Sequence, residues 1–105
     1  MTTSEDVNQI VQAIVSQFHP RRIILFGSQA RGEASPDSDL DLLVEMETTL
    51  PRREQVRRIR RSFDPYPCAM DIVVYTPDEV RKWAQASASL AATVMREGRI
   101  LYEQQ

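Results

Sequence analysis

The chain has 105 residues, of which 42% are hydrophobic and 27% charged, and its formal net charge is −2. These values are typical of one small globular domain, so we expect a single domain over residues 1–105. The small negative charge excludes a general electrostatic attraction to nucleic acid or to an anionic membrane. No apolar run reaches the length of a membrane-spanning helix, so we expect no membrane partner.

The only cysteine, Cys68, cannot form an internal disulfide. A lone cysteine is typical of a reducing compartment, where it behaves as a small apolar residue. The first residues also lack the basic start and apolar run of a signal peptide. We therefore expect a cytoplasmic protein.

Apolar residues recur at helical spacing over residues 3–18, which predicts an amphipathic helix. His19 and Pro20 end it, because a residue before proline avoids the α region. His19 is the only histidine, and at a helix end we interpret it as a cap rather than a catalytic base. Arg21 and Arg22 follow at the entrance to a strand, where we expect both to be solvated.

The most informative pattern begins with an apolar run at residues 23–26, which predicts a short buried strand. Gly27-Ser28 follows this strand, and residues 29–31 are compatible with a short helix. Residues 32–38 are rich in Gly, Ser, Pro and Asp, which predicts a loop. The chain returns as a second strand over residues 39–44. Its alternation puts Asp39 and Asp41 on one face and Leu40, Leu42 and Val44 on the other, towards a core.

Two carboxylates on one strand face repel each other unless a cation lies between them. Mg²⁺ suits such a pair, because it takes oxygen ligands from one or two carboxylates and from substrate phosphates. Gly27-Ser28 suits the phosphates, since glycine lets the backbone approach closely and a helix start directs N–H groups at an anion. Each part alone is more often a helix cap or a solvated strand end. Together the two parts favour a site for a metal-bound triphosphate.

These residues also carry a family resemblance. Gly27-Ser28-Gln29-Ala30-Arg31-Gly32 followed by Ser38-Asp39-Leu40-Asp41-Leu42 resembles the signature of the polymerase-beta-like nucleotidyltransferase superfamily. The short chain is similar to the minimal nucleotidyltransferases of bacteria and archaea, which are often the antitoxins of HEPN–MNT toxin–antitoxin pairs. Gln29 departs from the pattern, where arginine is more frequent, but this position binds no metal.

Residues 51–63 predict a helix with Pro51 in its first turn and a narrow apolar stripe of Val56, Ile59 and Phe63. Its exposed surface is basic. A solvated helix whose long side chains cover their own stems is one interpretation. The others are a surface for an acidic partner, or for RNA bound to that partner. Direct nucleic-acid binding is disfavoured, because no aromatic residues are interleaved to stack on bases. The arginines are Arg52, Arg53, Arg57, Arg58, Arg60 and Arg61.

A third strand is predicted over residues 69–75, where Asp71 interrupts a mostly apolar run. A buried carboxylate is costly unless it is paired or bound to metal. The resemblance implies that Asp71 is the third acidic residue of the site. The alternative is a strand-end aspartate that forms a salt bridge with an arginine.

Thr76, Pro77 and Glu79 predict a helix start with a capping box. A second helix, near residues 90–95, ends at Gly98, a favourable residue after a helix. Residues 100–102 predict a last strand or a packed tail. This closing segment also resembles that of minimal nucleotidyltransferases.

We therefore expect an α+β domain of the polymerase-beta-like nucleotidyltransferase fold. Its small mixed sheet is formed by residues near 22–26, 39–45 and 69–75, with helices mainly on one face. The resemblance implies nucleotidyl transfer from ATP with two Mg²⁺ ions. It assigns catalysis and metal binding to Asp39, Asp41 and Asp71, and nucleotide binding to Gly27, Ser28 and Arg31.

The acceptor follows from the resemblance alone. It implies that AMP is added to a tyrosine of a cognate HEPN ribonuclease toxin, which silences the toxin. One alternative is a transferase that modifies a small molecule such as an antibiotic, although these normally carry an extra domain. The other is an antitoxin that neutralises by binding without catalysis.

Overall fold

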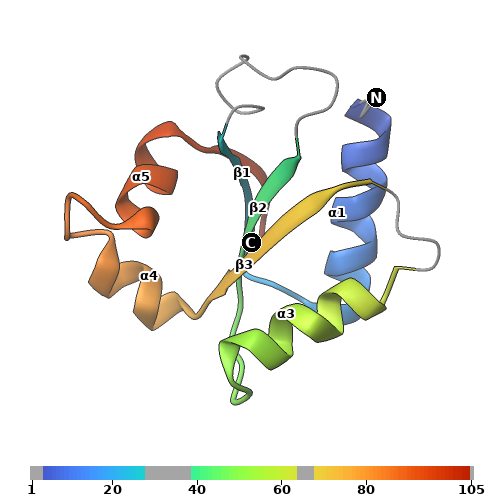
Figure 1. Ribbon diagram of the computed structural model, residues 1–105, viewed down its shortest axis with the longest axis horizontal. Helices are drawn as coiled ribbons and strands as arrows, with labels where there is room; N and C mark the ends of the chain where they lie inside the picture. The colour runs from blue at the N-terminus through green and yellow to red at the C-terminus, as the bar shows by residue number, and fades with distance from the viewer. Residues whose placement is uncertain (1–3, 28–38, 64–67, 105) are drawn as a thin grey trace.

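The computed structural model describes residues 4–27, 39–63 and 68–104. Every expected helix and strand within these ranges is present, with ends within about two residues of those predicted. The short helix expected at residues 29–31 lies outside the described residues, as do Ser28 and Arg31. In chain order the elements are α1 (Ser4–Phe18), β1 (Arg22–Phe26), β2 (Leu40–Glu45), α3 (Arg52–Arg61), β3 (Met70–Tyr75), α4 (Pro77–Trp83), α5 (Leu90–Glu97) and β4 (Arg99–Glu103) (Figure 1).

The strands form one mixed sheet in the order β3-β2-β1-β4. β1 pairs antiparallel with both β2 and β4, and β2 pairs parallel with β3. The last segment of the chain is therefore a strand of the sheet rather than a packed tail. In this order β3 and β4 are the edge strands.

Among the described residues, no helix is long and apolar enough to cross a membrane.

Helices cover both faces of the sheet, with α1 and α3 on one side and α4 and α5 on the other (Figure 1). Strand alternation divides the core accordingly. The larger cluster lies beneath α1 and α3, and the smaller one joins Ile24 and Leu43 to Val94 of α5. The expected α+β class and mixed sheet are confirmed. The expectation of helices mainly on one face is wrong, because Ile24 and Leu43 make the second face of the central strands apolar as well, and α5 covers them (Figure 1). The larger cluster includes Ile10, Val11, Ile14, Ile23, Leu25, Leu40, Leu42, Val44, Ile59, Met70, Ile72 and Val74.

Two helix ends were predicted from single residues. His19 does end α1: it has a positive φ of 51°, and its N–H donates to the carbonyl of Val15 at 3.1 Å. Gly98 ends α5, but its backbone is extended, at φ −75° and ψ 162°, rather than left-handed. Glycine is required there by close packing, because a Cβ would lie 2.4 Å from the Val94 carbonyl oxygen and 2.6 Å from Ile24 Cγ2.

The expectation of a solvated Arg22 is wrong. Arg22 and Glu45 are register partners in the β1–β2 pair, and the Arg22 guanidinium donates to the Glu45 carboxylate. Glu45 is only 2% exposed and the Arg22 side chain 18%. The hydrogen bond to Glu45 raises the pKa of the Arg22 guanidinium above its usual value, while partial burial opposes this. The pair neutralises a carboxylate that would otherwise be costly to bury.

Candidate active site

The candidate residues meet at one end of the sheet, where β1 ends and β2 and β3 begin. Asp41 lies between the other candidate residues. It is the register partner of Phe26 in β1 on one side and of Asp71 in β3 on the other. Asp39 directly precedes β2, and Gly27 directly follows β1. Residues far apart in the sequence are thus brought together by strand pairing alone.

Asp41 and Asp71 are direct neighbours across the parallel β2–β3 pair. Because their positions are paired in register, both side chains leave the same face of the sheet, the face that also carries Leu43 and α5. Neighbouring strands lie about 4.8 Å apart. Alternation places Asp39, two residues earlier, on this face as well. Asp41 is half-buried, whereas Asp39 and Asp71 are exposed.

Gly27 packs directly against Asp41. Its φ of +75° lies in the left-handed region that favours glycine. A Cβ at this position would lie 2.2 Å from Asp41 Oδ2 and 3.1 Å from its Cγ. Both the backbone conformation and the space therefore require glycine. The result is a backbone segment, at the end of β1, that passes close to a carboxylate of the candidate site.

The environment of Asp71 differs from the one that the sequence predicted. A buried carboxylate was predicted, but its side chain is 64% exposed, because it lies on β3, an edge strand of the sheet. Arg60 of α3 lies 3.9 Å from Asp71 Oδ1, and the same Arg60 nitrogen donates to the carbonyl of Met70 at 3.3 Å. The alternative expectation was an aspartate at a strand end that forms a salt bridge with an arginine. Arg60 is the arginine that lies in position to form it.

The donor chemistry of the three carboxylates fits Mg²⁺, which prefers oxygen ligands. Within residues 4–27, 39–63 and 68–104, however, no group of three or more His, Cys, Asp or Glu side chains is gathered closely enough to hold a metal ion. The register brings Asp41 and Asp71 side by side. Binding a shared cation would require their carboxylates, and that of Asp39, to turn towards one point.

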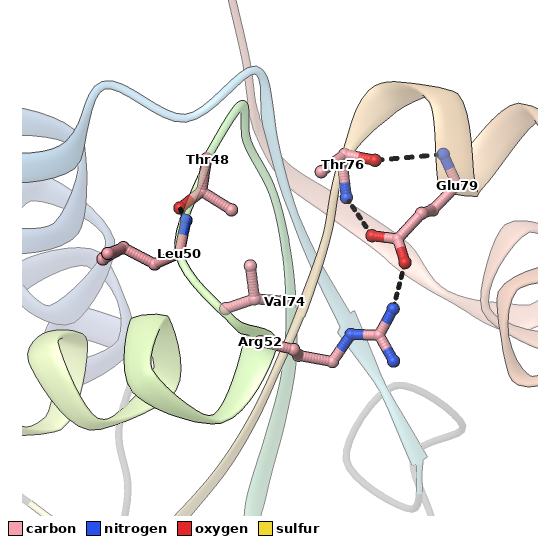
Figure 2. Close-up of a pocket in the computed structure, with 6 residues that line it drawn as sticks. All are labelled: Thr48, Leu50, Arg52, Val74, Thr76 and Glu79. Atoms are coloured by element: carbon pink, nitrogen blue, oxygen red, sulfur yellow. Dashed lines mark hydrogen bonds and ion pairs between the residues drawn. The ribbon is translucent and has the colours of Figure 1, made fainter.

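A cavity of about 260 Å³ lies at the opposite end of the same strands (Figure 2). Three of its polar lining residues, Arg52, Thr76 and Glu79, interact with one another. The Arg52 guanidinium pairs with Glu79 and lies 4.7 Å from the centre of the Tyr75 ring. Glu79 accepts from the backbone N–H of Thr76, and the Thr76 hydroxyl accepts from the N–H of Glu79, so the predicted capping box is confirmed. The residues that line the cavity are Thr48, Leu50, Arg52, Val74, Thr76 and Glu79.

Sequence reasoning did not single out Arg60 for the site, because it is one of six arginines in α3. Only the position of α3 beside the open edge of β3 distinguishes it. Arg60 projects from a helix on the α1/α3 side and reaches a carboxylate that belongs to the other face. Helix α3 therefore places the positively charged side chain of Arg60 next to the candidate site.

Comparisons with known proteins concern the family and the fold of the chain. Residues 7–104 match the nucleotidyltransferase domain family. A protein of Methanocaldococcus jannaschii, provisionally named protein adenylyltransferase MJ0604, is 27% identical over 104 residues, which are 97% of this chain and 100% of the relative. Protein adenylyltransferase MntA of Thermococcus cleftensis is 43% identical over 51 residues, or 45% of this chain, a match that spans about half (52%) of the relative's length.

Solved structures show the same fold. A crystal structure of a toxin–antitoxin with AMP-PNP is similar at a TM-score of 0.60 and 26% identity, over 93% of this chain and 73% of the other. A provisionally assigned nucleotidyltransferase from Sulfolobus solfataricus is similar at a TM-score of 0.66 and 19% identity, over 93% and 78% of the two chains. The resemblance inferred from Gly27-Ser28 and the Asp39/Asp41 pair is confirmed: this chain belongs to the nucleotidyltransferase domain family.

Proposed function

We propose that this chain transfers AMP from ATP to a tyrosine of a HEPN-domain ribonuclease toxin, and thereby acts as its antitoxin. Membership of the nucleotidyltransferase family supports the transfer of a nucleotidyl group. Relatives named as protein adenylyltransferases support AMP and a protein acceptor. The similar toxin–antitoxin structure with AMP-PNP supports both an adenine nucleotide and a toxin partner.

The single observation that carries the proposal is the row formed by Gly27, Asp41 and Asp71. Asp41 and Asp71 are register partners on one face, and Gly27 packs against Asp41. A carboxylate pair beside an approachable backbone suits a triphosphate with its counter-ions. Asp39, Asp41 and Asp71 would hold two Mg²⁺ ions, which when bound stabilise the charge of the reacting phosphates and activate the attacking oxygen.

The chain's own residues would then have separate roles. The Gly27 backbone lets the phosphates approach β1, and Ser28 and Arg31 would contact the phosphates. In the reaction the tyrosine oxygen forms a bond to the α-phosphorus, the bond to the bridging oxygen breaks, and pyrophosphate leaves. The tyrosine proton would pass to Asp71, whose exposure on an edge strand leaves it accessible to an incoming hydroxyl.

Co-expression with the HEPN toxin tests this proposal. The intact mass of the toxin should increase by one or more AMP units with the wild-type chain. The D39N/D41N double variant should still bind the toxin but add no mass. Asp78→Asn is the matched control, because Asp78 is an exposed carboxylate of α4 that pairs with Arg81 away from the site. It should modify the toxin like the wild type.

Two outcomes would contradict the proposal. A toxin that stays unmodified, yet is inhibited equally by the wild type and by the double variant, would mean neutralisation by binding alone. AMP transfer to an antibiotic, with none to the toxin, would mean a small-molecule transferase.

A further inference from the structure

Charge is distributed very unevenly between helix α3 and the rest of the chain. Six of the 13 basic residues and one of the 15 acidic residues lie in its ten positions. The helix therefore carries a formal charge of +5, and the remainder of the chain −7. Such a separation creates a directional field that attracts an oppositely charged surface to one side of the molecule.

Three of these arginines form a straight row. Arg53, Arg57 and Arg61 recur every four residues, so they lie above one another on the helix surface. All three are exposed, and they lie on the side opposite Gln55 and Ile59, which are buried. At a rise of about 1.5 Å per residue the row is roughly 12 Å long. We call these three residues the arginine row.

Other arginines of α3 interact with residues of neighbouring elements, but the positive charge of the arginine row is balanced by very few acidic side chains. Arg52 pairs with Glu79, and Arg60 contacts Met70 and Asp71. Within the described part of the chain, the row has one ion pair, between Arg57 and Glu54 at 3.5 Å on the same helix. Like charges four residues apart on a helix destabilise it. A surface that maintains this repulsion is well suited to an acidic partner.

The row also leads to the candidate active site. Arg61 at its end directly follows Arg60, which lies 3.9 Å from Asp71. A protein that lies along the arginine row therefore also lies at the open edge of β3, beside the site carboxylates. This placement connects binding on α3 with delivery of an acceptor hydroxyl to the site.

We propose that the arginine row is the docking surface for an acidic face of the protein acceptor, close to its modified tyrosine. The role as acceptor rests on the proposed function, whereas the docking itself does not. Protein is favoured over RNA for two reasons. Helix α3 has no aromatic residue on which bases could stack, and the negative remainder of the chain would repel a continuous phosphate backbone.

Fluorescence anisotropy with synthetic peptides tests the docking. The probes are a short peptide with one tyrosine among Asp and Glu, an equally long peptide with Asn and Gln in their place, and a single-stranded RNA. Each is titrated with the wild-type chain and with R53Q/R57Q/R61Q. The matched control, R81Q/R96Q/R99Q, removes the same charge from three arginines that are exposed on α4, α5 and β4.

The wild type should bind the acidic peptide more tightly than the neutral peptide. The row variant should bind the acidic peptide roughly tenfold more weakly at low salt, with a smaller difference at high salt, because exposed charges are screened. The control should stay within about twofold of the wild type. Circular dichroism should show equal helix content in all three proteins.

The proposal fails if both triple variants weaken binding alike, if the acidic and neutral peptides bind equally, or if the row binds the RNA in preference to the acidic peptide. Repeating the titration with D39N/D41N separates this inference from the proposed function. Docking should survive in that variant. If docking at the row persists while no AMP reaches any acceptor, the proposed function fails and the docking surface stands.

Discussion

The Arg60 guanidinium reaches round the open edge of β3 and lies 3.9 Å from the carboxylate of Asp71, which is paired in register with Asp41. The positively charged side chain of Arg60 therefore lies next to the two carboxylates that are proposed to bind metal. Both side chains are substantially exposed, at 45% and 64%. An ion pair this exposed is weak, so a divalent cation can displace it.

Arg60→Gln should therefore increase the affinity for Mn²⁺ in the absence of nucleotide, by about three- to tenfold at low salt. The substitution removes both a competitor for Asp71 and a repulsive positive charge. Free Mn²⁺ measured by electron paramagnetic resonance reports the change. Arg57→Gln, which removes the same charge farther along α3, should have a smaller effect. Equal or weaker Mn²⁺ binding by Arg60→Gln would refute this expectation.

Gly27→Ala should abolish Mg²⁺-dependent binding of AMP-PNP, since the new methyl group would displace the Asp41 carboxylate. It should also lower the free energy of unfolding by about 1–3 kcal/mol, because alanine is strained at the φ of Gly27. Gly98→Ala is the control. It also introduces a close contact, with Val94 and Ile24, but away from the site. Both variants should melt at a lower temperature, and only Gly27→Ala should lose AMP-PNP binding, as measured by isothermal titration calorimetry.

Glu45→Gln should lower the free energy of unfolding by about 3 kcal/mol, since it leaves the partly buried Arg22 without its charged partner. Replacing both residues with methionine should recover much of this loss, because no unpaired charge then remains. Urea denaturation of the single and double variants forms a thermodynamic cycle. A double variant less stable than the single one would show that the ion pair itself stabilises the fold.

The capping box of α4 should make stability depend on pH. The hydrogen bond from the Thr76 backbone N–H lowers the pKa of Glu79 from its usual 4.5, and Arg52 adds to the shift, while burial opposes it. A lowered pKa in the folded state stabilises the protein above pH 4.5, and this contribution disappears as the pH falls through the folded-state value.

Glu79→Gln should therefore be less stable than the wild type at neutral pH, by on the order of 0.5 kcal/mol, because glutamine keeps the cap but not the charge. The difference should vanish in acid. Thermal melts across the acidic range measure it, and a difference that stays constant with pH would contradict the assignment.

The helices and strands could be predicted because local patterns determine them. Alternation in residues 39–44 separates Asp39 and Asp41 from Leu40 and Leu42, and the structure buries both leucines. The Thr76, Pro77 and Glu79 pattern specifies the start of α4 without tertiary information. Pairs that depend on register were not predictable. Arg22 meets Glu45 only because β1 and β2 pair as they do.

The environment of Asp71 shows the same limit. Its sequence neighbours are apolar, which indicates burial, yet β3 lies at the edge of the sheet and Asp71 is exposed. Strand order comes from long-range pairing, which no local pattern of residues 69–75 contains. The roles of Ser28 and Arg31 remain predictions, since both lie outside the described residues.

The most direct test of AMP transfer follows two labelled forms of ATP. The purified complex of this chain with the HEPN toxin is incubated with Mg²⁺ and ATP labelled at either the α- or the γ-phosphate. The toxin should acquire the α-label and not the γ-label, and EDTA or Asp41→Asn should abolish labelling. Transfer of the γ-label, or α-labelling that persists in EDTA and in Asp41→Asn, would contradict AMP transfer by this chain.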